Sequence, residues 1–115
     1  MSRSRPERGA KLAGRAAVFA ALGDETRLSL IGRLSSGPPQ SISRLSDGSV
    51  LTRQAITKHL RVLEAAGVVH SVRAGRENLF AFRPEPLRDL QSYLGRVSDQ
   101  WDDALGRLKA FVEKG

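Results

Sequence analysis

Apolar side chains recur every three or four residues along most of the chain, and this spacing predicts helices. A first helix is expected over residues 10–22, which are rich in helix-forming residues and are followed by a glycine. A second helix begins after Asp24, a favourable N-cap, and stops at the Gly-Pro-Pro of residues 37–39. A short third helix precedes the Asp-Gly of residues 47–48. The apolar residues expected on the second and third helices are Leu28, Ile31, Leu34, Ile42 and Leu45.

The fourth predicted helix, over residues 52–66, has a clear division into an apolar and a polar face. Thr52 suits its N-cap, and Gly67 follows at the position where a left-handed residue commonly ends a helix. The apolar face is expected to pack in the core, which leaves the polar face toward solvent. The apolar residues are Ala55, Ile56, Leu60 and Leu63.

The pattern changes after this helix. Residues 68–73 and 77–83 read as two short strands around a tight turn at residues 74–76. Pro84 and Pro86 end the hairpin and open a long final helix, in which apolar residues again recur at helical spacing. The predicted fold is mainly α with a small β-hairpin, in the order helix, helix, helix, helix, strand, strand, helix.

The 115 residues make up one domain, over residues 10–115, preceded by a disordered basic arm at residues 1–9. The formal net charge is +7. This excess lies in residues 1–23 and 50–83, whereas acids and bases nearly balance in the last quarter of the chain. A basic stripe of this kind favours a polyanionic partner, nucleic acid before a membrane surface.

The composition excludes several classes of site. There is no cysteine, which excludes disulfides, thiolate zinc sites and iron–sulfur clusters. No apolar run approaches the roughly 20 residues of a membrane span, and no apolar segment of a secretory signal follows the basic start. Neither a glycine-rich phosphate loop nor a Gly-x-Ser-x-Gly motif is present. We expect a soluble cytoplasmic protein that is not an enzyme and needs no cofactor.

The polar face of the helix over residues 52–66 is the main candidate site. Two short helices joined by a turn, followed by a hairpin, are typical of a winged helix-turn-helix, whose second helix enters the major groove of DNA. An ordinary solvated helix face is the alternative, but three bases and no acid between Thr52 and Arg61 favour DNA. For His59, a phosphate contact and a packing contact both stay open. The candidate DNA-binding residues are Thr52, Arg53, Gln54, Thr57, Lys58, His59 and Arg61, with Arg73 and Arg76 at the wing tip.

Three segments resemble ArsR/SmtB-type regulators. Residues 22–31 (LGDETRLSLI) resemble the family's N-terminal signature, residues 51–69 (LTRQAITKHLRVLEAAGVV) its recognition block, and residues 73–76 (RAGR) its wing tip. The resemblance covers roughly residues 12–115, and the family consists mainly of dimeric winged-helix transcription factors, mostly repressors. It implies that the helix over residues 52–66 is the one that reads DNA. Since a two-fold dimer places two such helices about one turn of DNA apart, we expect a pseudo-palindromic operator, with the wing on the flanking backbone or minor groove.

The metal-sensing residues of the best-known members are missing. The third-helix segment over residues 40–45 has no cysteine, and the last helix has no histidine. We interpret the remaining carboxylates of that helix as solvated surface and His70 as a partly buried strand residue. The sequence therefore predicts a non-metal-sensing branch without a metal site. The carboxylates are Asp99, Asp102, Asp103 and Glu113.

The last helix carries a longer apolar stripe than one subunit needs, which indicates a homodimer. The resemblance likewise implies a dimer through the first and last helices. Two alternatives stay open: a winged-helix protein-interaction module without specific DNA binding, and a sensor whose dimer interface binds a small-molecule effector. The candidate interface residues are Ala16, Phe19, Ala20, Trp101, Leu105, Leu108 and Phe111.

Overall fold

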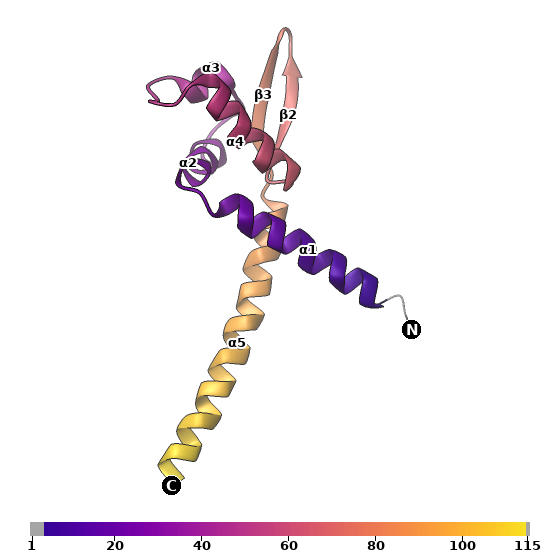
Figure 1. Ribbon diagram of the computed structural model, residues 1–115, viewed down its shortest axis with the longest axis vertical. Coiled ribbons are helices and arrows are strands. Elements are labelled where there is room, and N and C mark those ends of the chain that lie inside the picture. Colours follow the sequence, from indigo (N-terminus) through magenta and orange to yellow (C-terminus); the bar gives the residue numbers. More distant parts are fainter. Residues whose placement is uncertain (1–3, 115) are drawn as a thin grey trace.

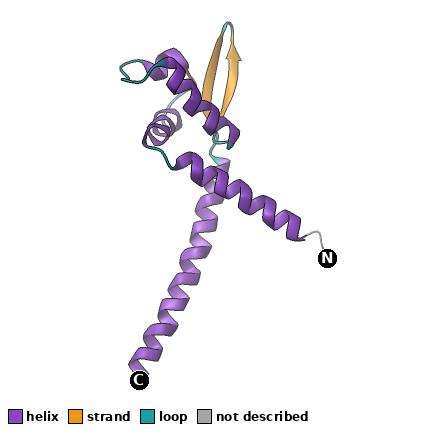
Figure 2. Ribbon diagram, in the orientation of Figure 1, coloured by secondary structure: helices purple, strands orange, loops and turns teal. Residues whose placement is uncertain are grey.

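The computed structural model describes the backbone of residues 4–114 and, from residue 11 onward, their side chains. Five helices and a three-stranded sheet follow one another along the chain (Figures 1 and 2). The predicted order is confirmed, with one strand added. The elements are α1 (Ser4–Leu22), α2 (Glu25–Ser35), β1 (Gln40–Ser41), α3 (Ile42–Ser46), α4 (Arg53–Ala65), β2 (Val69–Ala74), β3 (Glu77–Phe82) and α5 (Glu85–Lys114).

The molecule is far more extended than a globular chain of its length. Its radius of gyration is 19.3 Å and its extents are 68 × 38 × 21 Å, whereas a compact chain of this size has a radius of gyration of about 13 Å. Helices α2 to α4 and the sheet form one body, α1 crosses the first part of α5, and both helices project beyond it (Figure 1). Much of α1 and α5 is therefore left without a partner in the single chain.

The core lies where α2, α4 and the base of the sheet meet. Phe80 of β3 and Leu60 and Leu63 of α4 are completely buried, as the helical and strand patterns predict. On α2, however, Leu28 is 54% exposed and Leu30 takes its place in the core. Spacing allows either residue on the inner side of a helix, and the packing of α2 against β3 and α4 decides between them. The other core residues are Val18, Ala21, Ile31, Leu34, Leu45, Ile56, Val68, Val69 and Leu90.

The sheet has the strand order β1-β3-β2 and is antiparallel throughout. The long hairpin formed by β2 and β3 is the predicted wing, and Gly75 at its turn has a φ of 63°. Strand β1 was not predicted: Gln40 pairs with Phe80 and Ser41 with Leu79. Two residues are too few to show a strand pattern, so only the tertiary structure reveals this pairing.

The start of α1 also differs from the prediction. The disordered arm expected over residues 1–9 is wrong for residues 4–9, which form the first turns of α1, and residues 1–3 lie outside the described residues. Pro6 is compatible with this start because the first four N–H groups of a helix have no partner within the helix.

Candidate nucleic-acid interface

Helix α4 is the candidate recognition helix, called the reading helix below, and it begins with the predicted N-cap. Thr52 has extended backbone angles, and its Oγ1 accepts a hydrogen bond from the Ala55 N–H at 3.1 Å. At the other end Gly67 has a φ of 79°, as a left-handed C-terminal glycine should. The cap fixes the first turn, which carries the residues predicted to meet base edges.

The structure brings five of the predicted residues together on the first two turns of α4. Thr52, Arg53, Gln54 and Lys58 are exposed, and the half-buried Thr57 donates from Oγ1 to the Arg53 carbonyl at 2.7 Å. An open recess of about 610 Å³ runs along this face. Its lining also includes Ile42 of α3, which the sequence analysis named as an apolar residue of the third helix and not as a site residue. The face thus combines two cations, an amide and apolar contact area, which are the groups that read base edges in a major groove.

Arg61 lies further along α4 and pairs with Glu64, which joins the helix to the wing. Its Nη1 donates to Glu64 Oε1 at 2.8 Å, and Ser71 of β2 donates from Oγ to Glu64 Oε2 at 2.8 Å. The hydrogen bonds from Ser71 and then Arg61 hold the pKa of Glu64 below its usual range. Since Arg61 keeps more than half of its side chain exposed, it can face a phosphate while it stays paired with Glu64, which is the residue bonded to the hairpin.

The wing tip carries the two predicted arginines. Arg73 and Arg76 are both exposed, on either side of the turn at Gly75. Arg73 donates from Nε to the Gly75 carbonyl at 3.3 Å, which orients it along the turn. The wing tip is therefore a second basic surface, at the far end of the hairpin from α5 (Figure 1).

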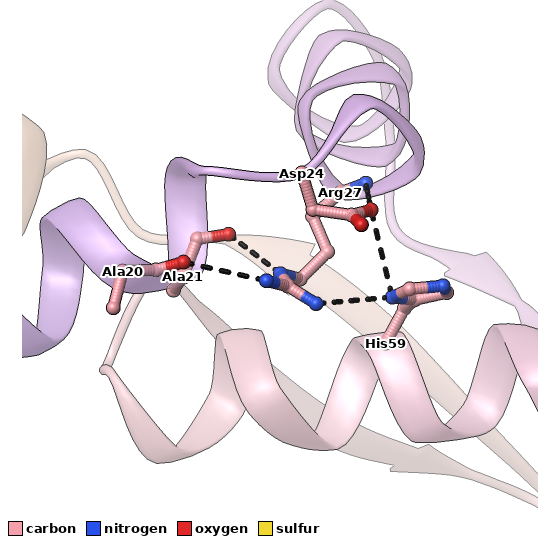
Figure 3. A network of polar contacts seen from close by, with 5 residues as sticks. All are labelled: Ala20, Ala21, Asp24, Arg27 and His59. Atoms are coloured by element: carbon pink, nitrogen blue, oxygen red, sulfur yellow. Dashed lines mark hydrogen bonds and ion pairs between the residues drawn. The ribbon is translucent and has the colours of Figure 1, made fainter.

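His59 does not belong to this exposed face. Its ring is half-buried and points toward α2, where Nδ1 lies 3.2 Å from Arg27 Nη1 and 3.8 Å from Asp24 Oδ2 (Figure 3). Arg27 also donates to the carbonyls of Ala20 and Ala21 at the end of α1. Of the two interpretations, the structure favours the contact within the protein, and we remove His59 from the candidate DNA-binding residues.

The residues that hold His59 were not identified from the sequence as a group. Asp24 was assigned only as the N-cap of α2, and its Oδ2 indeed accepts from the Arg27 N–H at 3.0 Å. This hydrogen bond is the main cause of a lowered pKa at Asp24. Both residues lie in the segment 22–31 that resembles the family signature, which was the available signal.

The histidines and carboxylates considered as metal ligands do not gather into a metal-binding group in the described part of the chain. Among the described residues, no group of three or more histidine, cysteine, aspartate or glutamate side chains could hold a metal ion. His70 is half-buried on β2, opposite Ala81, and its Nδ1 has no hydrogen-bond partner among the described side chains. No helix within residues 4–114 is both long enough and apolar enough to span a membrane.

The predicted interface residues form two uncovered surfaces. Trp101 is 63% exposed and Phe111 is 77% exposed on the projecting part of α5, although Leu90 at the crossing with α1 is buried. Ala16, Phe19 and Ala20 of α1 are exposed as well. Leu105 and Leu108 complete the apolar stripe on α5.

Comparison with known proteins identifies the family. A model described as a helix-turn-helix domain matches residues 22–72. The HTH-type transcriptional regulator YuzN of Bacillus subtilis, described as uncharacterized, is 41% identical over 80 residues, which are 64% of this chain and 87% of the relative. The solved structure of an ArsR-like transcriptional regulator from Rhodococcus sp. RHA1 is 38% identical, with a TM-score of 0.84 over 92% of this chain and 96% of that one. This chain belongs to the ArsR family.

Membership of the ArsR family makes the chain a DNA-binding transcriptional regulator. The fold is shared more widely: a homodimeric winged helix-turn-helix DNA-binding domain from Mycobacterium bovis is 22% identical, with a TM-score of 0.65 over 81% of this chain and 85% of that one. Within the ArsR fold, the matched region 22–72 runs from the end of α1 into β2 and so includes α4. The predicted reading helix thus lies inside the region that defines the match.

Proposed function

We propose that the chain acts as a homodimeric repressor that places α4 in the major groove of a pseudo-palindromic operator. The observation that carries the proposal is the cluster of Thr52, Arg53, Gln54, Thr57 and Lys58 on the capped first turns of α4. Arg and Lys reach guanine O6 and N7, and Gln pairs with adenine through two hydrogen bonds. Arg61, Arg73 and Arg76 contact the backbone or the minor groove beside it and so position the duplex.

The homodimer is supported by the uncovered stripes on α1 and α5. A second copy that lays its own α5 on Trp101, Leu105 and Leu108 removes these apolar side chains from water on both subunits. The similar domain from Mycobacterium bovis is described as homodimeric. A two-fold dimer carries its two reading helices about 34–36 Å apart, which is one turn of DNA. A dimer seated on such a site blocks a promoter that overlaps it, and this is the repression that we propose.

The experiment that tests the proposal is selection of the purified chain's preferred sites from a library of random duplexes. The expected result is a motif with dyad symmetry and half-sites one helical turn apart. A motif without dyad symmetry contradicts the dimeric reading. Placing the selected site across the promoter of a reporter then tests repression, which requires lower expression in the presence of the chain.

Two substitutions separate base reading from phosphate contact. Gln54→Ala is expected to cost about 1–3 kcal/mol on the selected site and to relax the preference at one base pair. Lys58→Ala is expected to weaken binding to all duplexes and to lower the salt slope by about one. Lys109→Ala, at an exposed position on α5, is the matched control and should leave both quantities unchanged. Equal losses on selected and random DNA for Gln54→Ala contradict its reading role.

A further inference from the structure

A cleft of about 670 Å³ lies between α1 and α5, apart from the reading face. Its size falls within the range of small-molecule sites, which is roughly 300–1,000 Å³. Residues of α1 form one wall and residues of α5 the other, near the place where the two helices cross (Figure 1). The lining includes Lys11, Leu12, Arg15, Tyr93, Arg96 and Val97.

The charge of the cleft is strongly one-sided. Lys11, Arg15 and Arg96 all line it, and among the described residues the carboxylate of Asp89 lies within reach of all three charges. Arg15 engages that carboxylate through two hydrogen bonds, of 2.9 and 3.1 Å. Lys11 and Arg96 line the cleft beside Arg15, and neither forms an ion pair with the described side chains, so both can approach a ligand.

The rest of the cleft lining can contact the apolar part of a ligand. Leu12 is 52% exposed and Val97 is half-buried, and both line the cleft. The Arg15 guanidinium stacks on the Tyr93 ring, with its carbon 4.8 Å from the ring centroid. Because Asp89 and Tyr93 both hold Arg15, the wall on this side has a fixed shape. Basic groups next to apolar area form a mixed lining that matches a molecule with an anionic end and an apolar end.

We propose that the α1–α5 cleft binds a small organic anion, whose carboxylate or phosphate group lies between Lys11 and Arg96 and whose apolar body lies on Leu12 and Val97. The anion also competes with Asp89 for Arg15, so that its binding weakens the link between α1 and α5. The consequence for DNA rests on the proposed function: since these helices form the proposed dimer, a changed crossing misplaces the two reading helices. The anion therefore acts as an inducer that lowers affinity for the operator.

Binding is tested first on the full chain without DNA, by titration with 2-naphthoate followed through backbone amide NMR signals. The uncharged 2-naphthamide has the same ring system and is the matched control ligand. We expect saturable shifts from naphthoate, centred on Gly14 and Gly95, which flank the lining residues. Equal binding of naphthamide, shifts centred elsewhere, or no saturable shift would overturn the proposal. The last result is also what a second subunit that fills the cleft would produce.

Substitutions then identify the anion-binding groups. The double variant Lys11→Gln, Arg96→Gln should raise the dissociation constant for naphthoate about tenfold or more, because charge-assisted hydrogen bonds are lost. Arg107→Gln removes an exposed charge from α5 outside the cleft and should change nothing. A similar loss in both variants would mean that general electrostatic attraction holds the anion, which overturns the assignment.

The regulatory step has its own measurement. Saturating naphthoate should weaken binding of the wild-type chain to its selected operator at least tenfold, and the double variant should not respond at the same concentration. An unchanged operator affinity, with naphthoate bound in the cleft, refutes the inducer role. If the chain reads no duplex even without naphthoate, the proposed function fails, while the NMR titration still decides whether the cleft is an anion site.

Discussion

Arg27 Nη1 lies 3.2 Å from His59 Nδ1, and this contact ties the reading helix to the end of α1 (Figure 3). The same guanidinium donates to the carbonyls of Ala20, at 3.3 Å, and Ala21, at 2.7 Å. Because a guanidinium can only donate, this contact is a hydrogen bond when His59 Nδ1 carries no proton. One side chain of α2 thereby sets the position of α4 relative to a helix of the proposed dimer interface.

Arg27→Ala is expected to lower the free energy of unfolding by about 2 kcal/mol, because it leaves partly buried acceptors on α1 and α4 without their donor. His59→Asn, whose Oδ1 can replace Nδ1 as the acceptor, should retain most of the stability that His59→Leu loses. Urea unfolding of the three variants measures this. Arg107→Ala, exposed on α5, is the control, and a loss at Arg27 no greater than at Arg107 contradicts the role of the contact.

Thr52→Ala tests the cap of the reading helix. The variant loses the hydrogen bond that the Ala55 N–H donates to Thr52 Oγ1, and we expect about 1 kcal/mol of destabilisation. Thr52→Ser keeps a hydroxyl at the same position and should unfold close to the wild type. Thermal unfolding of both variants compares them, and a serine variant that is as unstable as the alanine variant would argue against capping as the cause.

Local chemistry explains what the sequence could predict. The cap at Thr52, the left-handed Gly67 and the apolar stripe through Leu60 and Leu63 each follow from residues close together in the chain, and the structure has all of them. The exposed cluster from Thr52 to Lys58 follows from the same pattern, since it is the opposite face of one helix. For this reason most of the candidate reading face could be identified without a structure.

The features that were missed depend on contacts between distant segments. His59 looks like a surface residue of α4 until α2 brings Arg27 against it, 32 positions away in the chain. Strand β1 exists only because β3 pairs with it, and Leu28 is exposed only because α2 packs through Leu30. Periodicity places residues on faces, but it does not say which neighbour a face will meet.

The Arg15–Asp89 pair predicts a dependence of stability on pH. The hydrogen bonds from Arg15 hold the pKa of Asp89 below its usual range in the folded chain. A carboxyl group with a depressed folded-state pKa stabilises the fold above its unfolded value of about 3.9 and loses that contribution as the pH falls through the folded value. The wild type should therefore be more stable than Asp89→Asn at pH 7, and this difference should shrink below about pH 4.

Urea unfolding of both proteins at pH 7, 5, 4 and 3 at low salt measures the effect. Asp102→Asn is the control because Asp102 is exposed and forms no ion pair with the described side chains. A difference between wild type and Asp89→Asn that stays constant down to pH 3 would show that the pair does not link α1 and α5 through its charge.

A single charged residue placed in the apolar stripe of α5 is expected to dissociate the proposed dimer. Trp101→Glu places a carboxylate on each side of a two-fold interface, where burial without a partner is unfavourable, and should raise the dimer dissociation constant by about 100-fold or more. The control is Ser92→Glu, which adds the same charge nine residues earlier on α5. Nine residues are two and a half helical turns, so Ser92 lies on the opposite side of α5, and this variant should leave the dimer intact. Sedimentation velocity over a range of concentrations compares the variants.

The fluorescence of Trp101 gives an independent test of this interface in the wild-type chain. Trp101 is the single tryptophan of the chain and is 63% exposed in the isolated subunit. If a second α5 covers it, its fluorescence emission should move to shorter wavelength as the protein concentration rises through the dissociation constant. A wild-type chain that sediments as a monomer at micromolar concentration with water-exposed emission would contradict the α5 interface. The selected DNA motif would then lack dyad symmetry for the same reason.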